Sequence, residues 1–203
     1  MPLLQAVMAL LPRATVVECG VGDFSTEVLL HGSDAYFGIE HDQRWAEIAA
    51  TRFNRDSRFH LLTRQLPVAV GDLRESFTLA QVAIVEQIYD ELRTKLPEHY
   101  DVLFVDTFSG VRLTALEKLY DSAHTIVIHD TEPANFYGYA YNRFLPRVQD
   151  RHRYTFCPTG VPHTDVYTYS ELGADFERDL LAKAIAFFGD EFRLVGVWQE
   201  RRD

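Results

Sequence analysis

The stretch "TVVECGVGDFSTEVLL", residues 15–30, decides how the chain is expected to fold. Its first five residues form a mainly β-branched, apolar run of strand length. Gly20 and Gly22 follow in a turn, and a helical pattern begins directly after them. Glycines in a first strand-to-helix turn let the backbone approach a bound ligand and adopt conformations closed to other residues. The stretch therefore predicts a ligand-binding strand, turn and helix at the head of an α/β domain.

The composition indicates one acidic domain. The chain has 203 residues, of which 47% are hydrophobic, and this suffices for a single domain with a substantial core. A formal net charge of −10 disfavours general nucleic-acid binding, because a phosphate backbone would be repelled. Cys19 and Cys157 are too few for a disulfide framework and lack a paired metal-binding spacing, which favours a reducing, cytoplasmic setting.

The opening residues are apolar, but Pro12 and Arg13 interrupt them far short of the length that a membrane span needs. They also lack the charged n-region of a signal peptide. We therefore expect an amphipathic helix at residues 3–11 and no membrane partner. The expected parts of the single domain, 1–203, are an N-terminal helix in 1–13, a ligand-binding core in 14–132 and a substrate-side and edge-strand region in 133–203.

Strand and helix patterns alternate through the first two thirds of the chain. Strands are expected at 15–19, 35–40, 58–65, 100–106 and 124–130, with helical patterns between them. Parallel neighbours need crossover helices, so this order predicts a doubly wound α/β sheet. Two further strand patterns, joined by a turn around Gly160, indicate an antiparallel C-terminal edge. The expected sheet is mostly parallel and seven-stranded.

The second helical pattern, residues 42–54, has an apolar face of its own. Trp45, Ile48 and Ala49 fall on one side at helical spacing. We expect Trp45 to pack in the core, since a large aromatic ring on an apolar face is usually buried there, and a contact with the adenine of a ligand is the alternative.

The glycine turn differs from the dinucleotide-binding fingerprint, because no third glycine follows Gly20 and Gly22 at the required place. Glu18 stands just before the glycines, where its carboxylate would repel a pyrophosphate. The same carboxylate would suit a cationic ligand. The turn therefore favours a nucleotide-like ligand that carries positive charge and no phosphate.

S-adenosylmethionine is such a ligand, since it carries an amino group and a sulfonium. Glu18, Gly20 and Gly22 form an E-x-G-x-G pattern that resembles the class I S-adenosylmethionine-dependent methyltransferases, and Thr26 follows on the helix. This Rossmann-like family has an acidic residue at the end of its second strand that binds the ribose hydroxyls, and Glu40 in "YFGIEHDQRW" matches it. One carboxylate can accept from two vicinal hydroxyls.

A third match lies in "YDVLFVDTFSGVR" and "TIVIHDTE", which look like the fourth and fifth strands of small O-methyltransferases. The resemblance covers roughly residues 14–132. It implies that the cofactor is bound by Glu18, Gly20, Gly22, Thr26, Glu40 and Asp106. Thr107 and Phe108 replace the usual Gly-Pro after the fourth strand, and His129 replaces the first acid of an Asp-Asp pair.

Asp106 and Asp130 end buried strands at the carboxyl edge of the sheet, where open α/β folds bind their ligands. Methyl transfer to a hydroxyl requires alignment of the acceptor and removal of its proton. In one route, the two aspartates join Thr131 or Glu132 in holding Mg²⁺, which lowers the pKa of the acceptor hydroxyl. In the other, His129 or Asp130 acts directly as the base. The catalytic candidates are therefore Asp106, His129 and Asp130.

Residues 129–147, behind the fifth strand, are unusually aromatic. Aromatic faces with hydroxyl tips suit a sugar or phenolic acceptor. Core packing of a helix, or a homodimer interface, explains the same composition. Arg112, which follows "DTFSG", either binds an acidic group of the acceptor or begins its helix.

The sequence thus favours an S-adenosylmethionine-dependent methyltransferase acting at oxygen on a small molecule or saccharide. One alternative is a noncatalytic module that binds an adenosyl or nucleotide ligand in a methyltransferase-like fold. A nicotinamide-dependent oxidoreductase is another, and the missing third glycine counts against it. The acceptor, the metal requirement, the oligomeric state and the choice of base stay open.

Overall fold

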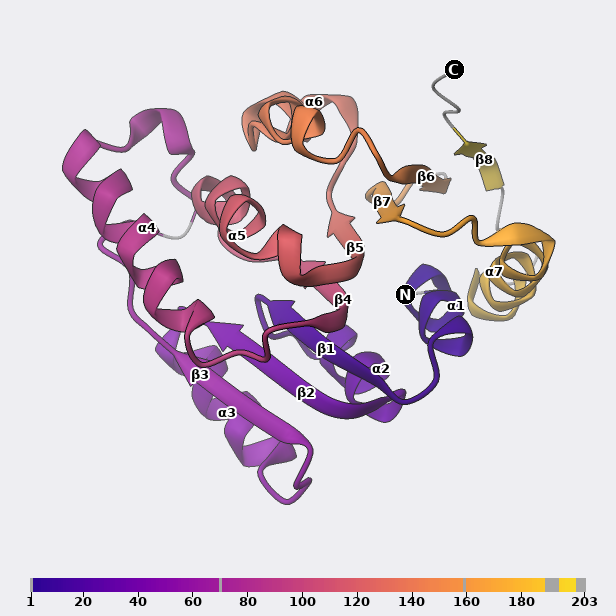
Figure 1. Ribbon diagram of the computed structural model, residues 1–203, viewed down its shortest axis with the longest axis horizontal. Helices are drawn as coiled ribbons and strands as arrows, with labels where there is room; N and C mark the ends of the chain where they lie inside the picture. The colour runs from indigo at the N-terminus through magenta and orange to yellow at the C-terminus, as the bar shows by residue number, and fades with distance from the viewer. Residues whose placement is uncertain (1, 70, 159, 189–193, 200–203) are drawn as a thin grey trace.

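An eight-stranded sheet runs through the part of the chain that the computed structural model describes, residues 2–69, 71–158, 160–188 and 194–199 (Figure 1). Its strands are β1 Ala14–Cys19, β2 Ser33–Glu40, β3 Phe59–Thr63, β4 Tyr100–Val105, β5 Ala123–His129, β6 His152–Pro158, β7 Thr164–Thr168 and β8 Leu194–Gln199. In space they follow the order β3-β2-β1-β4-β5-β7-β6-β8. The order reverses between β1 and β4, and such a switch point is where open α/β sheets bind ligands.

The strand directions confirm the predicted doubly wound sheet with an antiparallel C-terminal edge. β3, β2, β1, β4 and β5 are parallel neighbours. β7 pairs antiparallel with β5, β6 with β7, and β8 with β6. The sheet extends one strand beyond the expected seven, because β8 adds to the outer edge of β6.

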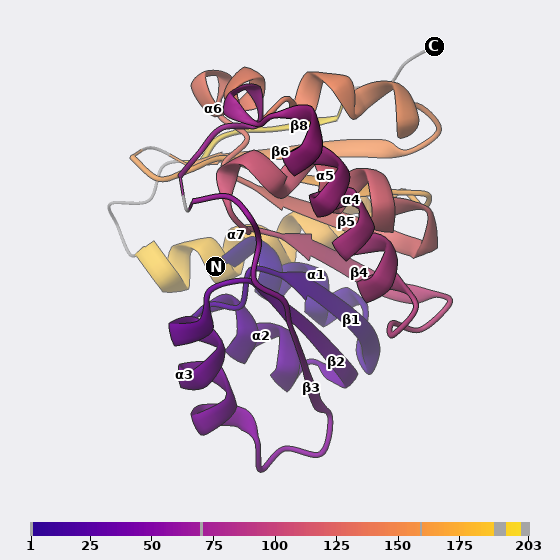
Figure 2. The same cartoon turned by 90° about the vertical axis from the view of Figure 1, so that its left-hand side faces the viewer.

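Helices cover both faces of the sheet (Figures 1 and 2). They are α1 Pro2–Leu10, α2 Ser25–His31, α3 Gln43–Phe53, α4 Leu79–Arg93, α5 Arg112–Leu119, α6 Pro133–Gly138 and α7 Gly173–Phe188. Short 3-10 turns link them: η1 Arg74–Ser76, η2 Ser109–Val111, η3 Tyr120–Ser122, η4 Tyr141–Arg143 and η5 Leu145–Arg147. α1, α2, α3 and α7 pack on one face, and α4 and α5 pack on the other.

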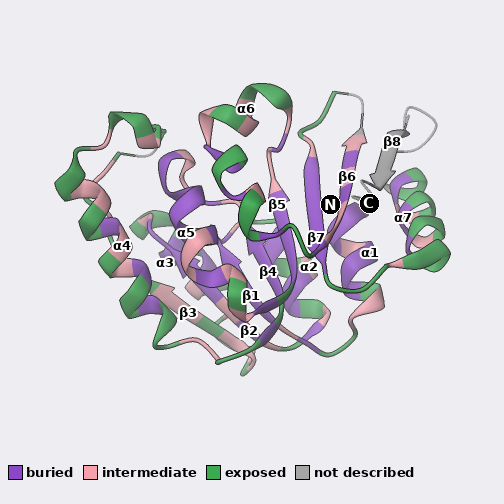
Figure 3. Ribbon diagram, turned by 45° about the horizontal axis from the view of Figure 1, so that its top comes forward, coloured by how far each residue is buried: buried purple, intermediate pink, exposed green. Residues whose placement is uncertain are grey.

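Strand β4 shows why an almost wholly apolar segment becomes a central strand (Figure 3). Leu103 and Val105 pack in the cluster under α4 and α5, whereas Val102 and Phe104 pack in the cluster under α1 and α2. Successive side chains point to opposite faces, so a strand covered on both sides needs apolar residues at every position.

The apolar opening of the chain forms α1, which packs against α7. Leu4 and Val7 of α1 share a buried cluster with Phe176 and Leu180 of α7. The expected N-terminal helix is thereby confirmed. None of the helices in the described residues is both long enough and apolar enough to cross a bilayer.

The predicted core position of Trp45 is wrong. Its side chain lies on the surface of α3 and is 43% exposed. Ala46 and Ala49 are the buried residues of this helix. The small alanines let α3 lie close to the sheet, and the helix turns its bulkier apolar residues outward.

Candidate functional site

The glycine turn joins the end of β1 to the end of β4. Gly20 has φ +89°, a left-handed conformation that side chains with a Cβ rarely adopt. A Cβ at this position would lie 2.2 Å from the carbonyl oxygen of Asp106. The backbone N–H of Gly20 donates to the carbonyl of Ile39, with 2.9 Å between N and O. The turn therefore brings the ends of β1, β2 and β4 together at the switch point.

Glu18 lies beneath this turn. Its side chain has no solvent exposure, and its Oε2 atom accepts hydrogen bonds from the hydroxyls of Thr26, at 2.7 Å, and Tyr36. Burial raises the pKa of Glu18 to about 7, against the opposing effect of the nearby hydroxyl groups. Its other oxygen, Oε1, has no hydrogen-bond partner among the described residues.

Thr26 links Glu18 to the turn itself. Its Oγ1 atom accepts from the backbone N–H of Gly22, with 3.1 Å between N and O, while its own proton goes to Glu18. Glu18 and Thr26 thus brace the start of α2 from within the protein. A direct contact between Glu18 and a ligand stays a prediction.

Glu40 ties the end of β2 to the same turn. Its Oε2 atom accepts from the backbone N–H of Val21 at 2.9 Å. Its Oε1 atom accepts from the backbone N–H groups of His41 and Asp42, both at 2.8 Å. Burial raises the pKa of Glu40, and these three backbone hydrogen bonds oppose the rise. Only 4% of the residue is exposed, so the turn and the carboxylate are fixed relative to each other.

His41 is a buried neutral group that the sequence reasoning missed. Its Nδ1 atom lies 2.8 Å from the carbonyl oxygen of Arg64, and its Nε2 atom lies 2.9 Å from the hydroxyl of Tyr89. A carbonyl only accepts, so Nδ1 carries the proton and Nε2 accepts from Tyr89. Burial lowers the pKa of His41 to about 4. The residue therefore joins the ends of β2 and β3 to α4.

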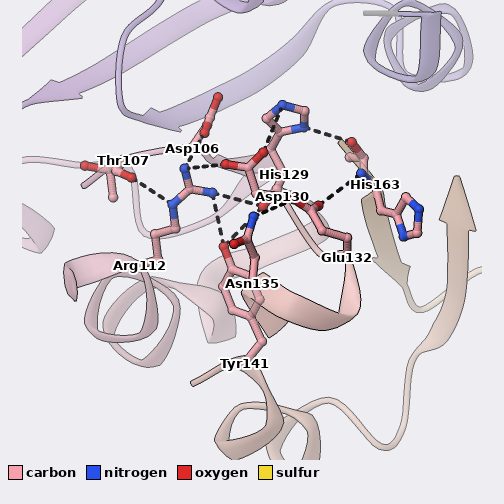
Figure 4. A network of polar contacts seen from close by, with 10 residues as sticks. Asp106, Thr107, Arg112, His129, Asp130, Glu132, Asn135, Tyr141 and His163 are labelled. Carbon is pink, nitrogen blue, oxygen red and sulfur yellow. Dashed lines mark hydrogen bonds and ion pairs between the residues drawn. The ribbon is translucent and has the colours of Figure 1, made fainter. Parts of the chain in front are cut away.

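Arg112, the first residue of α5, connects the two candidate aspartates (Figure 4). Its Nη2 atom lies 2.7 Å from Oδ1 of Asp106 and 3.0 Å from Oδ2 of Asp130. Its side chain is only 7% exposed. The aspartates that end the fourth and fifth predicted strands are therefore brought together, as expected, with a guanidinium between them.

The rest of the Arg112 guanidinium is also bound by the protein (Figure 4). Nε donates to the carbonyl of Thr107 at 2.8 Å, and Nη1 donates to the carbonyl of His129 at 3.0 Å and to the hydroxyl of Tyr141 at 3.3 Å. The ring of Tyr139 lies 4.7 Å from the guanidinium carbon. Burial disfavours the charged form, but the hydroxyl and carboxylate groups around it raise the pKa of Arg112 above its usual range.

His129 and Asp130 face the same site, although consecutive strand residues normally point to opposite faces. Asp130 has φ +58°, which turns the chain at the end of β5. Its Oδ1 atom then lies 3.6 Å from Nε2 of His129. The other ring nitrogen, Nδ1, lies 3.0 Å from the hydroxyl oxygen of Thr164. Both candidate bases are thus present at one point.

The residues at this edge do not fit the predicted Mg²⁺ site. Arg112 occupies the space between Asp106 and Asp130. The carboxylate of Glu132 accepts from an amide side chain of α6 and from a backbone N–H in the β6–β7 connection. The hydroxyl of Thr131 is buried and bonds to none of the described residues. Nowhere in the described residues do three or more His, Cys, Asp or Glu side chains form a group that could hold a metal ion.

The aromatic segment behind β5 divides between core and surface. Tyr141 and Phe144 are buried, whereas Tyr137 is 68% exposed. Tyr137 lines a cavity of about 580 Å³ between α6 and η4 on one side and η1 and the start of α4 on the other. Leu79 and Arg143 line the same cavity.

The predicted cofactor and reaction residues form two adjoining clusters. Glu18, Gly22, Thr26 and Glu40 surround the glycine turn, and His129 joins Asp130 at the end of β5. Asp106 belongs to both clusters, because its backbone meets Gly20 and its carboxylate meets Arg112. The sequence predicts Tyr141 only as a member of the aromatic segment and Arg112 only as an acceptor-binding residue or a helix start, and the contacts that Arg112 makes with Tyr141 and both aspartates were missed.

Comparisons with known proteins identify the fold. The sequence matches no protein-family description, and no curated protein matches it. Solved structures do match. An O-methyltransferase from Bacillus cereus in complex with SAH has a TM-score of 0.58 and 14% identity, over 82% of this chain and 80% of that chain.

Two further structures agree. A protein from Streptococcus mutans in complex with SAH has a TM-score of 0.56 and 8% identity, over 81% of this chain and 93% of that chain. An rRNA methylase from Streptococcus thermophilus has a TM-score of 0.52 and 12% identity, over 83% and 94% of the two chains. At such identities the likeness shows the fold alone. The chain has the fold of the class I S-adenosylmethionine-dependent methyltransferases, as its motifs predict.

Proposed function

We propose that this chain is an S-adenosylmethionine-dependent methyltransferase that methylates an oxygen atom of a small molecule or saccharide. The observation that carries the proposal is the meeting of Gly20, Glu40 and Asp106 at the switch point of a methyltransferase fold. SAH, the demethylated form of the cofactor, is bound in two structures of this fold.

The residues around the turn fit the chemistry of the cofactor. Oε2 of Glu40 accepts one hydrogen bond within the described residues, from Val21, which leaves an acceptor position for a ribose hydroxyl. The side chain of Asp106 is 28% exposed and follows the strand end that contacts Gly20. Its charge suits the amino group or the sulfonium of the ligand. Burial raises the pKa of Asp106, and Arg112 opposes this rise, which helps the carboxylate to stay charged.

A cavity beside α6 supports the proposal of a small acceptor molecule. The cavity of about 580 Å³ beside α6 falls within the range of small-molecule sites. Tyr137 and Leu79 offer it apolar surface, and Arg143 offers a cation that forms no side-chain hydrogen bond or ion pair with the described residues. The net charge of −10 weighs against an RNA acceptor, although solved structures of this fold include an rRNA methylase and a putative RNA methyltransferase.

His129 and Asp130 supply the chemistry that an oxygen acceptor needs. Methyl transfer from a sulfonium breaks the bond from carbon to sulfur and forms one from carbon to oxygen, so the hydroxyl must lose its proton. The imidazole of His129 takes that proton at Nε2, and the carboxylate of Asp130, 3.6 Å away, stabilises the positive charge that results. An acceptor hydroxyl within hydrogen-bond reach of Nε2 would be aligned by the same contact.

The test uses methyl-labelled S-adenosylmethionine with separate pools of saccharides, phenols and nucleic acids. We expect label in a saccharide or phenol product that resists mild alkali, as an ether does. Label in the nucleic-acid pool alone would contradict the proposed acceptor. Cofactor binding without transfer to any pool would favour the noncatalytic module instead.

A thermal-shift comparison of S-adenosylmethionine with NADH separates the remaining alternative. A ligand at 100 times its dissociation constant stabilises the native state by about 2.7 kcal/mol, which is readily measured. We expect the shift with S-adenosylmethionine and none with NADH. The reverse result would favour an oxidoreductase.

A further inference from the structure

The carboxyl ends of β4 and β5 hold two aspartates and one buried arginine in direct contact. We infer that the guanidinium of Arg112 takes the place of the Mg²⁺ ion that the sequence predicts between Asp106 and Asp130, and that proton removal at this site is independent of metal. The pair Asp106 and Asp130 then binds a metal ion only when Arg112 is removed. The catalytic part of this inference rests on the proposed function, whereas the metal-binding part does not.

The donors of Arg112 are all used by the protein. A guanidinium has five N–H groups, and no more. Their acceptors are Asp106 Oδ1, Asp130 Oδ2, the carbonyls of Thr107 and His129, and the hydroxyl of Tyr141. Arg112 therefore has no N–H left for an acceptor molecule, and the alternative that it binds an acidic substrate group is disfavoured.

Electrostatics explain why a cation belongs at this point. Two carboxylates that share a site repel each other, so one of them would hold a proton unless a cation lies between them. A guanidinium that gives two N–H groups to the carboxylates keeps three more for other acceptors, whereas the ammonium of a lysine keeps only one. Asp106 and Asp130 are contacted from the same Nη2 atom, at 2.7 Å and 3.0 Å.

The position of Arg112 is otherwise unfavourable for a cation. It is the first residue of α5, where the helix dipole repels positive charge, and only 6% of it is exposed. Burial of a charge is costly unless partners compensate for it. The two carboxylates and two backbone carbonyls provide that compensation, which ties the placement of Arg112 to this pair of aspartates.

The engaged donors of Arg112 also limit how the acceptor can lose its proton. A metal ion would bind the acceptor hydroxyl and lower its pKa, but Arg112 cannot contact the acceptor while its donors are engaged. The acceptor proton must then pass to a protein group. Of the two routes that the sequence leaves open, the direct one through His129 or Asp130 remains.

The test measures Mn²⁺ binding by the loss of the free-ion paramagnetic resonance signal, in full-length protein first stripped with chelator. The variants are Arg112→Ala, the double variant Arg112→Ala with Asp130→Asn, and Lys118→Ala. Lys118 is a matched control, because it lies on the same helix and pairs with Asp90 at 2.7 Å, away from the site. Circular dichroism checks that each variant is folded.

We expect wild type and Lys118→Ala to bind Mn²⁺ equally weakly. Arg112→Ala should gain one Mn²⁺ site, which Mg²⁺ competes for and the double variant lacks. Binding of one Mn²⁺ per chain by wild type would overturn the inference, and so would a folded Arg112→Ala variant that gains no site. If Arg112→Ala does not fold, Arg112→Gln replaces it, and if neither folds the wild-type titration decides alone.

A second readout separates this inference from the proposed function. Wild type is titrated with S-adenosylmethionine with EDTA and, separately, with MgCl₂. We expect the same affinity within about twofold, because Arg112 already supplies the charge. Failure of the proposed function would show as no binding in either buffer, with the Mn²⁺ results unchanged. Binding that needs MgCl₂ would overturn the metal-independent site.

Discussion

A Cβ atom at Gly20 would lie 2.2 Å from the backbone carbonyl oxygen of Asp106, so these two residues lock the first strand-end turn against the end of β4. Real Cβ atoms do not approach a backbone atom so closely. The contact places the glycine turn beside the carboxylate that we assign to both cofactor and reaction edge. The geometry of the site therefore depends on the absence of a Cβ atom at residue 20.

Gly20→Ala should therefore damage the site severely. The alanine must leave φ +89° or push β4 away, and either change costs more than the 1 kcal/mol or so of an ordinary glycine-to-alanine difference. We expect a lower melting temperature and loss of S-adenosylmethionine binding. Gly173→Ala is the matched control, since Gly173 also has a left-handed φ, +71°, but no atom lies within 4 Å of the place that its Cβ would take. Equal binding by Gly20→Ala and wild type would contradict the assignment.

The buried carboxyl of Glu18 should make the protein less stable as pH rises. In the unfolded chain Glu18 ionises near its ordinary pKa of 4.5, whereas the native state keeps the proton until a pKa of about 7. The native state thus binds the proton more tightly than the unfolded chain does. The free energy of unfolding that this tighter binding contributes is lost as pH rises from 4.5 to 7. Each unit of pKa difference is worth roughly 1.4 kcal/mol.

Glu18→Gln removes this titration and tests it. We expect urea unfolding of wild type to shift to lower midpoints, relative to the variant, as pH rises from 5 to 7. The difference between the urea midpoints of wild type and Glu18→Gln should no longer change above pH 7. Parallel curves over the whole range would show that the Glu18 carboxyl is not held protonated in the native state.

His41 should produce the opposite dependence on the acidic side. Its native pKa of about 4 lies below the ordinary value of 6.5, so the unfolded chain takes up the proton first as pH falls. The stability that neutral His41 contributes is present above pH 6.5 and is lost down to about pH 4. His41→Asn keeps a donor near Arg64 and cannot titrate. We expect wild type to lose stability more steeply than this variant between pH 6.5 and 4, and an equal slope would remove His41 as the cause.

His129→Gln should lower turnover far more than it lowers cofactor affinity. A positioned base contributes about 10²- to 10⁴-fold to a rate, so we expect a loss of that size in kcat. Asp130→Asn should lower kcat by less, because the imidazole that takes the proton is still present. Full activity in His129→Gln with loss in Asp130→Asn would reverse the two roles. Cofactor titrations of both variants serve as the control for folding.

The fold could be predicted because local patterns agree along the chain. The apolar run of β4, the glycine turn after β1 and the antiparallel edge at β6 and β7 each follow from residue types that neighbour each other in sequence. The predicted core position of Trp45 failed for a physical reason. Helical periodicity defines an apolar face, but the distance to the sheet decided that Ala46 and Ala49 would face inward.

Candidate site residues could be named from the sequence, whereas the directions of their side chains could not. The burial of Glu18 follows from its place on the same strand face as Val16, which packs under α1 and α2. Strand alternation carried that signal. Nothing local indicates that Arg112 reaches both aspartates, because that contact depends on how the ends of β4 and β5 meet in space.

A calorimetric titration with S-adenosylmethionine tests the central claim most directly. Wild type is compared with Glu40→Gln, and with Glu47→Gln on the exposed face of α3 as the control. We predict one site per chain in wild type and in Glu47→Gln, with binding at least about tenfold weaker in Glu40→Gln, because a ribose hydroxyl loses a charged acceptor. A folded wild-type protein that releases no heat and shows no thermal shift with the ligand would contradict the claim.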